Sequence, residues 1–167
     1  MVIRKTIWLM VTLILFLLFF VSGYLYHLFA PGMEIRTVIT PIDKETYQSL
    51  ESVEYAEHPE QKNFRKLTFT FTLKYSDKMK DIKAEMSEPL KNLLTYDVYW
   101  TGESFAFDDE KRNKFIVQED IVLYMGEVSE EDLVKLLDDG VFIVAWMEDG
   151  KEKRKEFNLG ETVLFIQ

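Results

Sequence analysis

The sequence predicts one membrane-spanning helix followed by a mainly-β domain, an antiparallel β-sandwich of immunoglobulin-like size with one short helix. Three observations support this prediction. Residues 7–29 form an apolar run without Asp, Glu, Lys or Arg. Short alternating or apolar segments then follow one another, separated by turn signals. No strand–helix–strand alternation of a parallel α/β fold appears. The likeness to immunoglobulin domains is architectural, because the chain has no cysteine and so lacks their Cys…Trp…Cys pattern.

The apolar run predicts a membrane anchor. As a helix it would be roughly 34 Å long, enough to cross a hydrocarbon core of about 30 Å. Cleavage as a signal peptide near Gly23 is the alternative, but the run continues to Phe29 and this favours an uncleaved anchor. Arg4 and Lys5 precede the run, and the positive-inside rule then puts the domain outside the cell. The expected organisation is a cytoplasmic tail at 1–6, a transmembrane helix at 7–29, a linker at 30–34 and an extracytoplasmic domain at 35–167.

The first half of the domain begins with a predicted strand from Ile35 to Ile42. A polar segment follows, with a short helix expected around Lys44 to Leu50. The clearest strand signal spans residues 67–75, where large apolar side chains alternate with three threonines and a lysine. One-sided alternation of this kind is typical of an antiparallel sheet. Residues 79–94 fit both helical and strand spacing, and Pro89 favours a strand followed by a turn.

The middle of the domain is rich in aromatic residues. Tyr96, Val98 and Trp100 are predicted to share one strand face, and Thr101-Gly102 is predicted to turn the chain. Phe105 and Phe107 would then follow on a short strand, mostly as core residues. Residues 108–114 form a charged turn, and a long strand is expected from 115 to 125.

One helix is predicted with clear end signals, over residues 130–139. Ser129 can cap its first turn together with Asp132, and Gly140 follows its end. Leu133, Leu136 and Leu137 form the stripe to be buried. A helix this short must pack on a sheet to be stable.

The last part of the chain contains the strongest hairpin signal. Asp149-Gly150 matches a type I′ turn between residues 141–148 and 151–156. A two-residue turn pairs Trp146 with Lys153, Val144 with Lys155 and Phe142 with Phe157. The returning strand is wholly charged over residues 151–156, as in an edge strand protected against pairing. Residues 162–166 are predicted to end the chain as a buried strand.

The charge balance narrows the classes of partner. All 29 acidic residues and 18 of the 20 basic ones follow residue 33. The domain therefore carries a formal charge of 18 minus 29, or −11. This charge opposes binding of nucleic acid, which needs clustered Lys and Arg. It also opposes adsorption to anionic lipid. The absence of cysteine together with the absence of an N-x-Ser/Thr acceptor favours a bacterial surface protein.

The sequence offers little chemistry. His58 is the only histidine after residue 33, so neither a nucleophile with a base nor a zinc site can be assembled from the usual residues. We therefore expect no catalytic residues, no cofactor and no metal. A site built from paired carboxylates stays open as an alternative, because acidic residues are numerous.

Contacts with a partner are the remaining site prediction. Tyr99 falls on the strand face opposite Trp100 and is a candidate contact residue. Lys151, Lys153, Arg154 and Lys155 form the one basic cluster, which would either protect a sheet edge or bind a partner. We expect a non-enzymatic, single-pass protein of the cell membrane that binds an envelope protein or serves as an accessory subunit of a membrane complex. The alternatives are a module binding a ligand, ion or wall polymer, and a protein secreted after signal cleavage.

Overall fold

The computed structural model describes residues 16–17 and 32–167. The chain divides into two compact units, residues 1–31 and residues 32–167. The predicted cytoplasmic tail and transmembrane helix lie outside the described residues, apart from Phe16 and Leu17. Within the part that is described, no helix has the length and apolar character needed to cross a bilayer. The strands and helices from β1 (Gly32–Pro41) to β8 (Val163–Phe165) all lie in the second unit.

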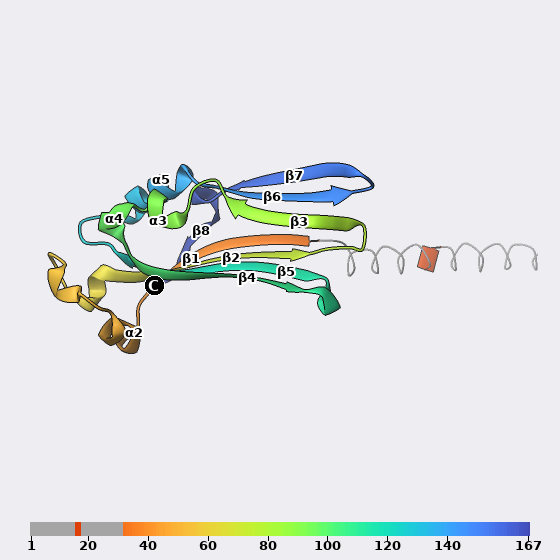
Figure 1. Ribbon diagram of the computed structural model, residues 1–167. Helices are drawn as coiled ribbons and strands as arrows, with labels where there is room; N and C mark the ends of the chain where they lie inside the picture. Colours follow the sequence, from red (N-terminus) through yellow and green to blue (C-terminus); the bar gives the residue numbers. More distant parts are fainter. Residues whose placement is uncertain (1–15, 18–31) are drawn as a thin grey trace, which may run out of the picture. The chain divides into compact units, whose positions relative to one another are not determined.

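This unit is a mainly-β domain with two sheets and a few short helices (Figure 1). The five-stranded sheet has the order β4-β5-β2-β1-β8 and the three-stranded sheet the order β3-β6-β7. The strands of the larger sheet are β1 (Gly32–Pro41), β2 (Phe64–Lys74), β4 (Tyr99–Asp109), β5 (Lys114–Tyr124) and β8 (Val163–Phe165). Those of the smaller sheet are β3 (Met79–Met86), β6 (Val141–Glu148) and β7 (Lys151–Asn158). The α-helices of this unit are α2 (Lys44–Ser49), α3 (Leu90–Leu93), α4 (Thr95–Val98) and α5 (Glu130–Asp138), and four single-turn 3-10 helices lie in the connections.

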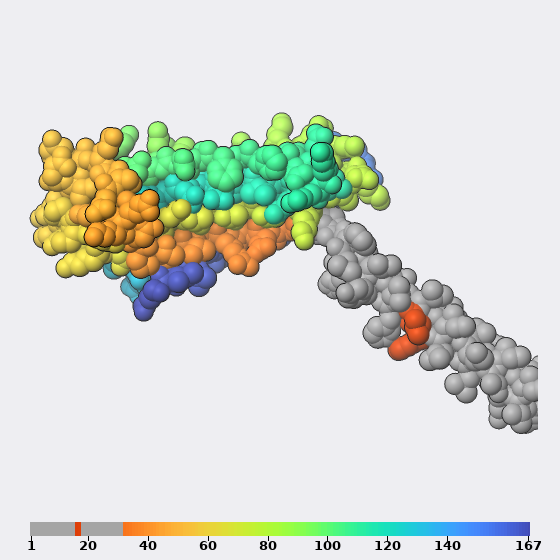
Figure 2. All heavy atoms as spheres, turned by 90° about the horizontal axis from the view of Figure 1, so that it is seen from below, coloured from red at the N-terminus to blue at the C-terminus, as the bar shows by residue number. Residues whose placement is uncertain are grey.

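The main core lies where β2 faces β6. The alternation of β2 buries one face fully, and the two sheets meet through its phenylalanines. The ring of Phe142 in β6 lies 5.0 Å from Phe69 and 4.8 Å from Phe71, measured between centroids. The threonines of β2 point to the opposite, outer face of the five-stranded sheet. Figure 2 looks onto that outer face, with β4 in green and β5 in teal along one side.

The helix predicted over residues 130–139 is confirmed as α5. The Ser129 hydroxyl accepts a hydrogen bond from the Asp132 backbone N–H at 3.1 Å and donates one to the Asp132 carboxylate at 2.6 Å. Leu133 and Leu137 are fully buried. Gly140 does not end the helix through a left-handed backbone. A Cβ there would lie 2.5 Å from Leu93 Cδ1 and 2.8 Å from Leu159 Cδ1, so any larger residue would force these two side chains to shift.

The β6–β7 hairpin is confirmed with its register. Asp149 and Gly150 have φ of +50° and +75°, as a type I′ turn requires. The three predicted pairs, between Phe142 and Phe157, Val144 and Lys155, and Trp146 and Lys153, are all present. β7 is an edge strand, as its run of charged residues predicted.

The predicted hairpin around Thr101-Gly102 is wrong. Residues 95–98 form helix α4, and β4 runs through Gly102 without a turn. The strand begins with a bulge between Tyr99 and Thr101, opposite β5. Phe105 and Phe107 are 51% and 56% exposed, not core, because they share the outer face with the threonines of β2.

Two further predictions need correction. Residues 90–93 form helix α3 where a turn was predicted, with Leu90 buried. The final strand β8 has three residues and pairs with β1 in parallel, so the two-sheet domain is not wholly antiparallel. β8 is also not buried, since it forms the edge of its sheet and Leu164 is 55% exposed.

Candidate functional site

The candidate site lies along β4, the edge strand of the five-stranded sheet. Its 11 residues pair with β5 on one side, and no described strand pairs on the other. Residues 101–108 are all exposed. The smaller sheet has only three strands, and residues 101–108 of β4 stay exposed, whereas Tyr99 and Trp100 at its start are half-buried.

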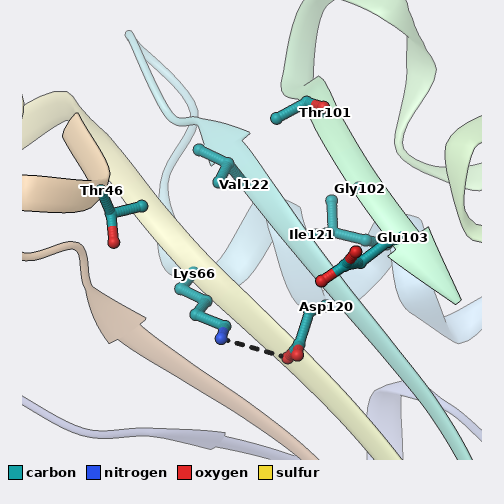
Figure 3. A pocket seen from close by; sticks show the side chains of 8 residues that line it. All are labelled: Thr46, Lys66, Thr101, Gly102, Glu103, Asp120, Ile121 and Val122. Atoms are coloured by element: carbon teal, nitrogen blue, oxygen red, sulfur yellow. Dashed lines mark ion pairs between the residues drawn. The ribbon is translucent and has the colours of Figure 1, made fainter. Parts of the chain in front are cut away.

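On the outer face, a hollow of about 290 Å³ lies between the start of β4 and helix α2. Figure 3 shows Glu103 and Asp120 on neighbouring strands at its floor, with Lys66 across from Asp120. Lys66 Nζ lies 3.3 Å from Asp120 Oδ1. The same carboxylate accepts hydrogen bonds from the Thr68 hydroxyl at 2.7 Å and from Gln118 Nε2 at 3.0 Å.

These contacts decide the ionisation of Asp120. Burial alone would raise the pKa of its carboxyl, but the hydrogen bonds from Thr68 and Gln118 and the charge of Lys66 outweigh burial and lower it. Asp120 is therefore a satisfied, structural anion. Glu103, directly opposite on β4, has no hydrogen bond or ion pair within the described residues.

On the inner face, a second hollow of about 300 Å³ lies between β4, β5 and helix α3. Its polar side chain from β5 is Glu119, which is half-buried and has no hydrogen bond or ion pair within residues 32–167. Burial raises the pKa of Glu119. Burial and then the charge of Glu119 also raise the pKa of Tyr99, whose side chain lines the same hollow.

The two neighbouring carboxylates do not form a catalytic pair. Their pKa values move in opposite directions, the pattern expected of an acid and a base that work together. Consecutive residues of a strand point to opposite faces, however, so Glu119 and Asp120 cannot flank one substrate bond. Among the described residues, no group of three or more His, Asp or Glu is placed to hold a metal ion.

A small aromatic cluster, separate from the main core, supports the end of β4. Phe64 is its buried centre, with ring centroids 5.4 Å from Trp100, 5.3 Å from Tyr124 and 5.7 Å from Tyr47 of α2. Trp100 Nε1 donates a hydrogen bond to the Glu51 carbonyl at 3.2 Å. These contacts fix residues 44–51 against the outer face and shape a third hollow, of about 690 Å³, beside the start of β4.

The predicted contact residues lie on two separate edges. Tyr99 opens β4, where it is half-buried and packs against the main core. The basic cluster, Lys151, Lys153, Arg154 and Lys155, lies exposed on β7 in the other sheet. Arg154 pairs with Glu156 at 2.8 Å and Lys155 Nζ lies 4.8 Å from the ring centroid of Phe157. No described contact brings the two sets together.

Sequence reasoning missed Glu119, Glu103, Phe105 and Phe107 as site residues. One signal could have found the phenylalanines. If residues 99–109 are taken as a single strand, Phe105 and Phe107 fall in line with Glu103 and Asp109, which points to a wet face. The role of Glu119 depends on the register with β4 and on the position of α3, which no local pattern reveals.

Comparisons with protein-family models and with the sequences of curated proteins gave no match.

Proposed function

We propose that this chain is a single-pass protein of a bacterial cell membrane whose external β-sandwich domain binds another envelope protein and has no enzymatic role. Residues 7–29 are the anchor in this proposal, with the N-terminus in the cytoplasm. The partner-binding surface is β4 and the outer-face residues beside it.

The observation that carries the proposal is the contrast between β4 and the other edge strands. Among the described residues, four strands lie at sheet edges. β8 has only three residues, β3 is interrupted by a bulge between Lys80 and Lys83, and β7 carries six consecutive charged residues. These are the usual means by which an edge is protected from pairing. β4 is long, and its centre, residues 104–107, is uncharged with two exposed phenylalanines.

Two experiments test this proposal. Protease treatment of spheroplasts should digest the domain while residues 1–6 stay protected, and a domain that survives in intact spheroplasts would refute the orientation. A photo-crosslinking amino acid at position 105 or 107 of the full chain should give one specific adduct in membranes. The matched control is position 164, which is equally exposed on the opposite edge of the same outer face. Equal crosslinking from positions 105 and 164 would refute a partner surface at β4.

A second candidate function is the binding of a small cationic ligand. It is favoured by the inner hollow of about 300 Å³ with its half-buried Glu119 and the phenol of Tyr99. Pockets of this size accommodate small ligands. Thermal stabilisation of the full chain by a simple diamine, lost in Glu119→Gln, would support this function, and no shift at millimolar diamine would exclude it.

A further inference from the structure

We propose that β4 binds its partner by strand addition, and that the partner segment is an extended, basic strand. This inference rests on the proposed function and specifies its chemistry. An added strand would continue the five-stranded sheet, with its backbone hydrogen-bonded to the free side of β4. Its alternate side chains would lie on the outer and inner faces of the sheet.

The backbone groups on the free side of β4 have no partner among the described residues. In an antiparallel pair, about half of the N–H and C=O groups of β4 point to β5 and the others point away. No described residue accepts or donates a backbone hydrogen bond on the outward side of residues 101–108. The outward N–H and C=O groups of β4 can therefore form hydrogen bonds with an added strand.

The outer face selects apolar side chains on the added strand. Phe105 and Phe107 are more than half exposed, and Phe107 lies opposite Ile116 of β5. A β-branched or aromatic residue next to each phenylalanine would bury this surface, as cross-strand pairs of this type do.

The inner face selects a basic side chain. The inward residues in the first part and centre of β4 are small, namely Gly102, Ser104 and Ala106, and Ser104 lies directly opposite Glu119. A strand beside β4 would lie roughly 10 Å from β5, two strand spacings away. A lysine or arginine on that strand can span this distance together with the side chain of Glu119. Lys91 of α3 also lines this hollow, but among the described residues it makes no ion pair with Glu119.

The charged residues of β4 favour a different protein, and not a second copy of this chain, as the source of the added strand. β4 carries Glu103, Asp108 and Asp109 and no basic residue. Two copies of β4 paired with each other would bring like charges together, which is unfavourable across strands. A basic β7 pairing with β4 of another copy would be a head-to-tail contact without closure, which produces open-ended assemblies. A basic strand from a different protein avoids both problems.

The test uses the full chain in nanodiscs and three synthetic eight-residue peptides with blocked ends. The first alternates Lys and Val, the second has Glu in place of each Lys, and the third is the first with N-methyl groups on alternate residues. Binding of the Lys peptide should slow deuterium uptake in residues 99–109 and leave residues 151–158 unchanged. The Glu peptide and the N-methylated peptide should bind at least tenfold more weakly.

Charge variants complete the experiment. Glu119→Gln should weaken binding of the Lys peptide about tenfold, whereas Glu161→Gln, an exposed carboxylate away from β4, should leave binding unchanged. Equal binding of all three peptides, no binding of the Lys peptide, or protection outside β4 would overturn the inference. So would concentration-dependent self-association that protects residues 99–109 without peptide.

Failure of this inference can be told apart from failure of the proposed function. Suppose that the adduct at position 105 forms in membranes and that Glu119→Gln leaves the yield of this adduct unchanged. A partner then binds at β4, but recognition does not depend on a basic side chain of the partner. If no adduct forms at position 105 or 107, the partner surface itself is refuted.

Discussion

Glu119 and Asp120 are neighbours in sequence, yet their isosteric amide variants are expected to change stability in opposite directions. Glu119 is half-buried without a partner, and Asp120 is held by Lys66, Thr68 and Gln118. Glu119→Gln should raise the free energy of unfolding at pH 7 by at most about 1 kcal/mol, because the amide avoids the extra cost of burying a charge but is still a polar group without a partner. Asp120→Asn should lower it by about 2 kcal/mol, because hydrogen bonds to a charged group are lost.

The dependence on pH follows from the two pKa shifts. Burial raises the folded-state pKa of Glu119 above its ordinary value of 4.5, so the unfolded chain loses this proton first as the pH rises. Stability then falls with rising pH until the folded-state pKa has been passed. For Asp120, burial is outweighed by its hydrogen bonds and by Lys66, and the folded-state pKa lies below the ordinary 3.8. Its contribution is present above pH 3.8 and is lost as the pH falls through the folded-state pKa.

Urea unfolding of the full chain in detergent, followed by tryptophan fluorescence between pH 3 and pH 8, measures both effects. The gain in Glu119→Gln should appear above pH 4.5 and be absent at pH 4, whereas the loss in Asp120→Asn should be largest at neutral pH. Glu103→Gln is the matched control, because Glu103 is exposed and unpaired. A loss of stability in Glu119→Gln at pH 7 would show that Glu119 has a favourable partner and would refute the reasoning.

Three further changes test the fold by the same unfolding assay. Phe71→Ala should cost about 3–5 kcal/mol because the ring is fully buried, whereas Phe105→Ala should stay within about 0.5 kcal/mol; similar costs would contradict the assigned faces of the sheet. Gly102→Ala should cost about 1–3 kcal/mol because a Cβ would lie 2.9 Å from Ile121, and Gly32→Ala, with open space, should be neutral; equal effects would argue against close packing at β4. Ser129→Ala should cost about 1 kcal/mol through loss of the α5 cap, and no change in the urea midpoint would show that the cap is dispensable.

The elements that sequence predicts well are those whose signals are local. The β6–β7 register follows from two residues, Asp149 and Gly150, because a two-residue type I′ turn fixes which residue of one strand lies opposite which residue of the other. The α5 helix likewise begins at a cap that its own neighbours complete. Neither prediction needed knowledge of what these segments pack against.

The helices α3 and α4 were missed because their helical spacing overlaps the alternating pattern of the preceding strand. Leu90, Leu94 and Val98 are all buried and recur every four residues, which is helical spacing that begins directly after Pro89. The alternation of the preceding strand overlaps this pattern and favours an extended chain. A proline at the start of a helix is compatible with the helix, so Pro89 was evidence for a boundary and not against helix α3.

The candidate site was harder to predict because its features depend on register. A glycine in a strand indicates either a turn or a close approach, and the sequence does not distinguish the two at Gly102. Phe105 and Phe107 are large apolar residues of the kind found in cores, and once Gly102 is taken for a turn, only their pairing with Gln118 and Ile116 shows that they share the threonine face. The opposite sheet has three strands against five, and residues 101–108 of β4 stay exposed in the described chain.

In the proposed function, the membrane anchor compensates for the weak binding expected of a short, open edge strand. Pairing along the uncharged centre of β4, residues 104–107, would be a small contact with modest affinity. If residues 7–29 hold the chain in the same membrane as its partner, the contact becomes effectively intramolecular, and a modest affinity then suffices. Release of residues 32–167 from the membrane should therefore abolish the adduct at position 105 at native concentration, while the Lys peptide at high concentration should still protect β4 of the full chain.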